Sequence, residues 1–134
     1  MEVHPNNWQF KTLQQLEKKD WGSPNDGDSF LVERCLQLTK IPLNEFTVED
    51  LRIMIGQNFG LIYLVTLAME RLKENILAEG DFYPGDLLKN VANINEQFWA
   101  DNEHLRKELM EIIKRNWQKL EGENISLGAF SIKN

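Results

Sequence analysis

The sequence is poor in the residues that cross-link a chain, coordinate metals or bind polyanions. Its 134 residues include one cysteine, Cys35, and two histidines, His4 and His104. A single cysteine excludes an internal disulfide and any multi-cysteine zinc site. Basic residues are also scarce, with 15 Lys and Arg against 21 Asp and Glu, so the net charge is -6. That balance argues against a nucleic-acid-binding protein, which needs a basic face.

Long hydrophobic runs are absent as well. The longest extends from Leu61 to Met69 and is interrupted by Thr66. Nine residues of helix rise about 14 Å, under half of a bilayer core. The first ten residues hold no apolar run behind positive charge, so we predict neither a secretory signal nor a membrane span. These absences and the unpaired thiol of Cys35 predict a cytoplasmic protein.

What the sequence does contain is helical periodicity around enough apolar residues, 42%, to form a core. The length predicts one domain over residues 1–134. We predict an all-α fold of five or six helices around a buried central helix at about 61–75, which is apolar nearly all round in its first half. Before it we expect a short helix ending near Asp20, a helix over about 29–40 and a helix opened by Thr47. The inward residues expected on the second and third of these helices are Leu31, Cys35, Leu38, Val48, Leu51, Met54 and Ile55.

The second half of the chain predicts two further helices and a tail. One helix is expected from about 85 to 99, weakened by Asn93 and Asn95. The last is expected from Asp101 or Asn102 to about residue 121, where Gly122 ends it. The tail, residues 123–134, alternates weakly and is predicted to be irregular or weakly extended, either docked or loose. The residues that alternate are Ile125, Leu127, Phe130 and Ile132.

Two stretches carry a resemblance to a known family. They are IPLNEFTVEDLRIMIGQN, residues 41–58, and ENILAEGDFYPGDLL, residues 74–88. Together with the apolar helix between them they resemble immunity proteins of bacterial contact-dependent growth inhibition systems, over about residues 36–92. The resemblance implies a cytosolic protein that binds and blocks the toxic C-terminal domain of a sibling cell's surface effector, commonly a nuclease. It assigns no role to individual residues and does not identify the toxin.

The charge distribution supports such a partner independently of the resemblance. Residues 41–101 hold ten acids and four bases, a net charge of -6, while the rest of the chain holds eleven of each. Between Glu74 and Asp86 there are four acids and no base. A nuclease binds a polyanion, so its cleft is expected to be basic, and an acidic surface can steer toward it or occupy it. We therefore expect the contacts with the toxin to come from Glu45, Glu49, Asp50, Glu74, Glu79, Asp81, Phe82, Tyr83 and Asp86.

Each of these residues also has a structural interpretation. Glu49 and Asp50 in a first helical turn serve capping and the helix dipole. The loop acids Glu79, Asp81 and Asp86 can be solvated turn residues, and Phe82 and Tyr83 can pack beneath their own loop. Partner specificity can also lie outside the family-like region. Rival contact surfaces are the N-terminal segment with Trp8, Phe10 and Trp21, and the last helix with His104, Glu108, Glu111 and Trp117.

Catalytic and cofactor chemistry finds little support. Glu79, Asp81 and Asp86 do not have the spacing of a calcium loop, so we predict no metal site. Gly56 and Gly60 lack the Lys and Ser/Thr of a phosphate-binding loop, and no cofactor is expected. We therefore predict a non-enzymatic toxin inhibitor. The alternatives are a helical adaptor or regulator with another basic partner and, third, an acid-dependent hydrolase.

Overall fold

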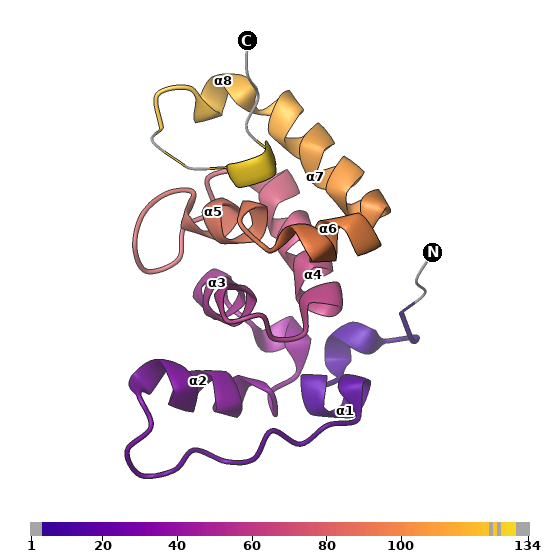
Figure 1. The fold of residues 1–134 in the computed structure, drawn as a ribbon, viewed down its shortest axis with the longest axis vertical. Helices are drawn as coiled ribbons and strands as arrows, with labels where there is room; N and C mark the ends of the chain where they lie inside the picture. The colour runs from indigo at the N-terminus through magenta and orange to yellow at the C-terminus, as the bar shows by residue number, and fades with distance from the viewer. Residues whose placement is uncertain (1–3, 124, 126, 131–134) are drawn as a thin grey trace.

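The computed structural model describes residues 4–123, 125 and 127–130. Within that part of the chain the secondary structure is helical, with no β-strand and one isolated antiparallel bridge between Glu79 and Pro84. The prediction of an all-α fold is confirmed (Figure 1). The α-helices are α1 (Leu13–Glu17), α2 (Phe30–Leu38), α3 (Val48–Gly56), α4 (Leu61–Glu74), α5 (Asp86–Ala92), α6 (Glu96–Asp101), α7 (Glu103–Arg115) and α8 (Trp117–Leu120). Short 3-10 helices span Trp8–Phe10 (η1), Leu43–Glu45 (η2) and Gly128–Phe130 (η3).

Although α3 packs against as many helices, α4 is a core element as predicted. It contacts α3, α5 and α7, and its buried residues are Leu64, Val65, Ala68, Met69 and Leu72. The prediction that its first half is surrounded on all sides is wrong, because Leu61, Ile62 and Tyr63 are only partly buried. Its polar end lies in water, with residues 70, 71, 73 and 74 exposed. Among the described residues no helix has the length and apolar character needed to cross a bilayer.

Helix α3 lies between α2 on one side and α4 and α5 on the other (Figure 1). Its start is a capping box: the Thr47 hydroxyl accepts from the N–H of Asp50 at 3.1 Å, and the Thr47 N–H donates to the Asp50 carboxylate at 3.0 Å. Leu51, Met54 and Ile55 are buried as expected, while Val48 is partly buried. The capping interpretation of Asp50 is therefore confirmed.

Helix α2 begins where Ser29 caps it, by accepting from the N–H of Val32 at 3.2 Å. Cys35 and Leu38 are buried, but Leu31, predicted to face inward, is 37% exposed. Phe30 and Val32 are exposed beside it. The prediction for Leu31 is wrong because the rest of the chain covers only one end of this helix, so the inward stripe begins at Cys35.

The two predicted C-terminal helices are each split, and asparagine side chains mark the breaks. Asn95 accepts from the N–H of Phe98 at 2.8 Å and starts α6, three residues after α5 ends. Asn116 donates to the carbonyl of Ile112 at 2.8 Å and separates α7 from α8. Asparagine favours such breaks because its amide competes with the backbone for hydrogen bonds. Five or six predicted helices consequently become eight α-helices in the described residues.

The described part of the tail is docked. Leu127 and Phe130 are buried, and η3 contacts α5. The Phe130 and Trp99 rings meet edge to face with their centroids 5.0 Å apart. Ile125, the first residue of the predicted alternation, is partly buried, and Ile132, the last, lies outside the described residues.

Candidate functional site

The loop between α4 and α5 is held in place by Asp86. Its carboxylate is 1% exposed and accepts from the backbone N–H of Gly80 at 2.7 Å and of Phe82 at 3.1 Å. A Cβ on Gly80 would overlap the Glu49 carboxylate and lie 3.3 Å from the Glu49 Cα, so glycine lets the loop approach α3 without displacing the Glu49 side chain. The loop is therefore ordered by a buried carboxylate and a close backbone contact.

A second carboxylate joins the same loop to α3. Glu49 accepts from Arg52 Nε at 2.6 Å and Nη2 at 2.5 Å, and from the backbone N–H of Asp81 at 2.9 Å, 32 residues along the chain. Arg52 Nε also lies 3.8 Å from the carboxylate of Asp86. The hydrogen bond from Arg52, together with that from Asp81, holds the pKa of Glu49 below its ordinary value despite partial burial. Arg52 is thus the shared partner of Glu49 and Asp86.

The aromatic pair of the loop is presented outward. Phe82 is 69% exposed, with the guanidinium carbon of Arg52 4.3 Å from its ring centroid. Tyr83 is 36% exposed, and Lys89 Nζ lies 6.0 Å from its ring centroid. The interpretation that Phe82 packs beneath its own loop is wrong, because its ring lies over Arg52 with most of its surface in solvent.

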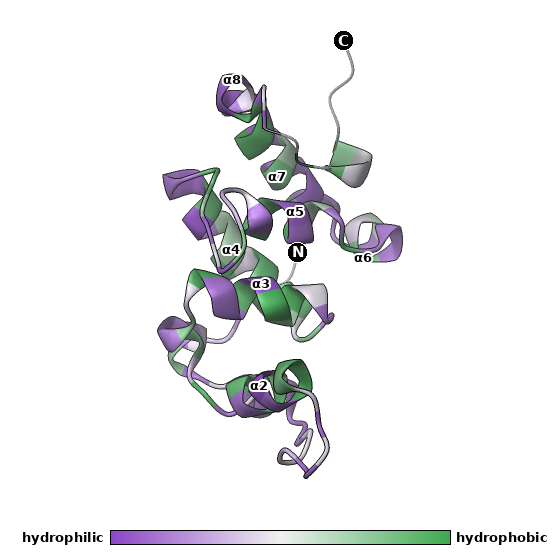
Figure 2. Cartoon of the chain, turned by 90° about the vertical axis from the view of Figure 1, so that its left-hand side faces the viewer, coloured by the Kyte–Doolittle hydropathy of each residue, from purple (hydrophilic) through white to green (hydrophobic). Residues whose placement is uncertain are grey.

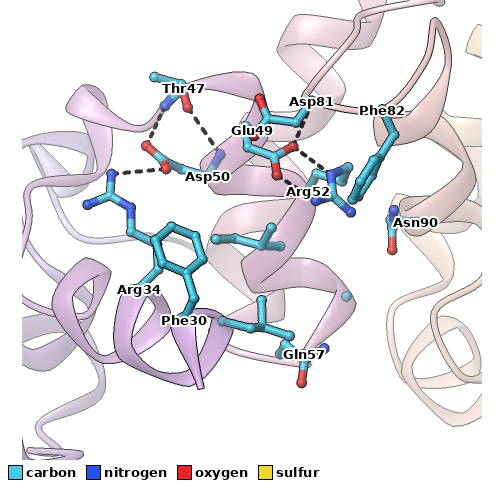
Figure 3. Close-up of a pocket in the computed structure, with 13 residues that line it drawn as sticks. Phe30, Arg34, Thr47, Glu49, Asp50, Arg52, Gln57, Asp81, Phe82 and Asn90 are labelled. Carbon is cyan, nitrogen blue, oxygen red and sulfur yellow. Dashed lines mark hydrogen bonds and ion pairs between the residues drawn. The ribbon is translucent and has the colours of Figure 1, made fainter. Parts of the chain in front are cut away.

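A groove of about 700 Å³ lies between α2, α3 and this loop (Figure 3). In Figure 2, which looks onto this side of the molecule, α3 crosses the middle with α2 below it and α5 above it. Phe30 and Arg34 line the groove from α2, and Asp81 and Phe82 line it from the loop (Figure 3). The remaining lining residues are Leu31, Thr47, Glu49, Asp50, Arg52, Ile53, Gly56, Gln57 and Asn90.

The α2 wall is a feature that the sequence analysis missed. Arg34 reaches across to α3 and pairs with Asp50 at 3.1 Å. Phe30, at the first position of α2, has its side chain in solvent. One signal was present in the sequence: Phe30 precedes Cys35 by five residues, which places the two on different faces of a helix.

The structure divides the predicted toxin-contacting residues into an exposed and an internal group. Asp50 and Asp86 are buried and serve the α3 cap and the loop. Glu49 is partly buried in its bond with Arg52. The exposed members are Glu45, Glu74, Glu79, Asp81, Phe82 and Tyr83. For Asp50 the structure supports the capping interpretation over direct contact. For Asp86 both interpretations are wrong, because its carboxylate is buried and accepts backbone N–H groups of the loop.

The rival surfaces are less uniform. In the N-terminal segment Trp8 is buried against Tyr63 and His4, Trp21 is partly buried against Phe59, and Phe10 is exposed. On α7, Glu108 pairs with Lys73 at 2.6 Å, while His104 and Glu111 are exposed. Trp117, at the start of α8, is partly buried. Helices α7 and α8 lie at the end of the molecule opposite α2 (Figure 1).

The titratable groups that meet beside the groove, Glu49, Arg52 and Asp86, are paired with one another. In the part of the chain that the structure describes, no three His, Cys, Asp or Glu side chains could hold a metal ion together. Cys35 is buried, and burial raises the pKa of its thiol, which disfavours the reactive thiolate. The groove instead combines paired charges with exposed rings, an arrangement suited to contact with another macromolecule.

Fold and groove define a small all-α protein with an aromatic-walled cleft on one side. Residues 15–126 match the family of CDI immunity proteins, where CDI is contact-dependent growth inhibition. The chain belongs to this family, and it is a toxin-neutralising immunity protein. The match extends well beyond residues 36–92, which carry the resemblance, and includes α2 and α7. Neither a curated protein nor a solved structure matches the chain.

Proposed function

We propose that this immunity protein acts in the cytoplasm as a stoichiometric inhibitor, with no reaction of its own, and that its cognate toxin domain is a nuclease. The observation that carries the proposal is the exposed acidic segment beside the groove. Glu74, Glu79 and Asp81 lie in solvent, and no base lies between residues 74 and 86. Glu45, just before α3, adds a fourth exposed carboxylate.

The electrostatic argument follows from what a nuclease must do. Its substrate is a polyanion, so its binding cleft is expected to carry a positive potential. An acidic surface is attracted to that cleft, and complementary charge raises association rates toward about 10⁸ M⁻¹s⁻¹ at low salt. An inhibitor that competes with nucleic acid for the cleft therefore binds there both faster and more favourably.

The internal carboxylates support the same surface indirectly. Asp86 and Glu49 accept three backbone N–H groups of residues 80–82, so the loop is ordered before any partner arrives. An ordered loop loses less conformational entropy on binding than a free one. In this proposal Asp50 and Asp86 position the surface, while Glu45, Glu74, Glu79, Asp81, Phe82 and Tyr83 contact the toxin.

The test is co-expression with the toxic C-terminal domain of the effector encoded next to this gene. We expect co-purification in a one-to-one complex, rescue of growth, and inhibition of nucleic-acid cleavage by the purified toxin domain. A toxin domain with no nuclease activity contradicts the nuclease part of the proposal. Neutralisation at substoichiometric amounts contradicts the absence of catalysis.

Charge-reversal variants of the loop acids test whether the loop is the toxin-binding surface. Glu79→Lys and Asp81→Lys are expected to lower the association rate at least about tenfold at low salt, with a smaller effect at high salt. Glu111→Lys on α7 reverses an exposed acid of the rival surface and serves as the matched control. A loss of affinity with Glu111→Lys alone would place the interface on α7 instead.

A further inference from the structure

We propose that the groove between α2 and the 79–86 loop receives an apolar side chain of the toxin domain that is flanked by basic residues. Phe30 and Phe82 are then the two anchors of the interface. The inference rests on the proposed function, since it takes the toxin domain as the partner. It adds a second wall, α2, to the acidic loop and states which chemistry the partner brings.

The first observation is the placement of two exposed rings at one groove. Phe30 is 82% exposed on α2 and Phe82 is 69% exposed on the loop, and Leu31 beside Phe30 is also exposed. Single exposed apolar residues are ordinary, but several gathered at one cavity mark an interaction site. Aromatic rings are also prominent among the residues that carry binding energy in interfaces.

The α3 side of the groove adds one apolar residue, Ile53, to the two rings. Ile53, 9% exposed, contributes an apolar surface there, next to Gly56. Asn90 closes this part of the groove, with its amide oxygen 3.0 Å from where a Cβ on Gly56 would lie. A partner side chain in the groove would have Phe30, Phe82 and Ile53 as apolar neighbours and Gln57 and Asn90 as polar ones.

The charges of the groove favour basic residues next to that side chain. Both guanidinium groups are already paired, Arg34 with Asp50 at 3.1 Å and Arg52 with Glu49 at 2.5 Å. Asp81 is a third carboxylate in the lining, against two arginines, and Asp86 lies behind Arg52. The excess is negative, so lysine or arginine next to the entering side chain is favoured and an acidic neighbour is repelled.

The backbone of both anchors and the ring of Phe82 are held before binding. The backbone N–H of Phe82 donates a hydrogen bond to the Asp86 carboxylate, and the Phe82 ring lies over Arg52. Phe30 is the first residue of a helix that Ser29 caps, and the Arg34–Asp50 pair ties that helix to α3. Rigid anchors reduce the entropy lost on binding, which favours tight association.

The experiment measures the affinity of the purified full chain for the purified cognate toxin domain, with Phe30→Ala, Phe82→Ala and Phe10→Ala. Phe10 is 66% exposed but does not line the groove, so it is the matched control. We expect each groove variant to weaken binding at least about tenfold and Phe10→Ala to stay within about twofold. Circular dichroism and urea unfolding verify that the variants are folded.

The outcomes separate this inference from the proposed function. If the wild type does not bind the toxin domain, both are overturned. If the wild type binds and both groove variants bind equally well, the groove is overturned while the proposed function stands. Self-association of the wild type that Phe30→Ala abolishes would assign the groove to a second copy of the chain and overturn the inference.

A separate crosslinking experiment tests which kind of toxin side chain occupies the groove. A photo-crosslinking phenylalanine analogue placed at position 30 or 82 is expected to capture a toxin residue that is apolar and has Lys or Arg neighbours. Capture of a toxin segment rich in acidic residues would contradict the inferred preference for basic neighbours. Weaker capture at position 10, under the same illumination, is the control.

Discussion

The guanidinium carbon of Arg52 lies 4.3 Å from the ring centroid of Phe82, and this contact links the inside of the loop to its exposed tip. On its polar edge the same guanidinium bonds Glu49 and lies near Asp86. Glu49 and Asp86 in turn accept the backbone N–H groups of the loop. The exposed ring therefore rests on a network of charged groups that is largely shielded from water, and the network can be tested one member at a time.

Replacing Asp86 by Asn is expected to destabilise the fold by about 1–3 kcal/mol. The amide can accept through only one oxygen, so one of the two loop N–H groups loses its partner, and Arg52 loses a nearby charge. Urea unfolding measures the change. Asp81→Asn, a loop carboxylate in solvent, is the control and should stay within about 0.5 kcal/mol. Equal stability of the two variants would contradict the structural role of Asp86.

Gly80→Ala tests the close approach of the loop to α3. The added Cβ overlaps the Glu49 carboxylate and lies 3.3 Å from the Glu49 Cα, so we expect a loss of about 1–3 kcal/mol. Combining it with Glu49→Ala removes the overlapping side chain but leaves the backbone contact. The two losses should therefore be clearly less than additive in a double-mutant cycle. Simple additivity would show that the overlap is not the cause.

The Glu49–Arg52 pair predicts a particular pH dependence. Because the folded-state pKa of Glu49 is lowered, its contribution is fully present above the unfolded pKa, about 4.3, and is lost as the pH falls through the folded pKa. The wild type should exceed Glu49→Gln in stability by about 1–2 kcal/mol at pH 7, with the gap closing below about pH 4. Urea unfolding across this range measures it, with Glu111→Gln as the exposed control. A gap that widens on acidification would contradict the assignment.

Phe130→Ala tests whether the C-terminal segment belongs to the core. The ring is buried and meets Trp99 edge to face, so its removal should cost about 3 kcal/mol through lost burial and a cavity. Loss of this contact should also change the tryptophan fluorescence of the folded state. Phe10→Ala, which removes an exposed ring of equal size, should be nearly neutral. A neutral Phe130→Ala would mean that the segment does not stabilise the protein.

The helical class, the core helix α4 and the caps could be predicted because they depend on neighbours a few residues away. Thr47 and Ser29 accept from N–H groups three residues on, and Leu51, Met54 and Ile55 follow one helical stripe. The breaks at Asn95 and Asn116 were missed because asparagine is tolerated inside helices as well as at their ends. Which of the two occurs depends on how the following segment packs.

Residues that the sequence indicated form one wall of the groove, and the opposite wall came from elsewhere in the chain. The acidic loop was visible as a run of carboxylates, and Asp81 and Phe82 do line the groove. The opposite wall, with Phe30 and Arg34, comes from α2, and nothing in the local pattern places α2 across from residue 82. The two internal acids, Asp50 and Asp86, look the same in sequence as the exposed Glu79 and Asp81.

By itself the sequence determined an acidic, all-α protein with a resemblance to an immunity family, because composition, periodicity and capping are properties of short segments. Only the tertiary structure decided which carboxylates face water and which accept internal hydrogen bonds. It also decided that α2 and the loop enclose one groove. Burial and pairing depend on groups that packing brings together from distant positions, such as Glu49 and the N–H of Asp81, 32 residues apart. For that reason the charge of a residue can be read from the sequence, while its structural role cannot.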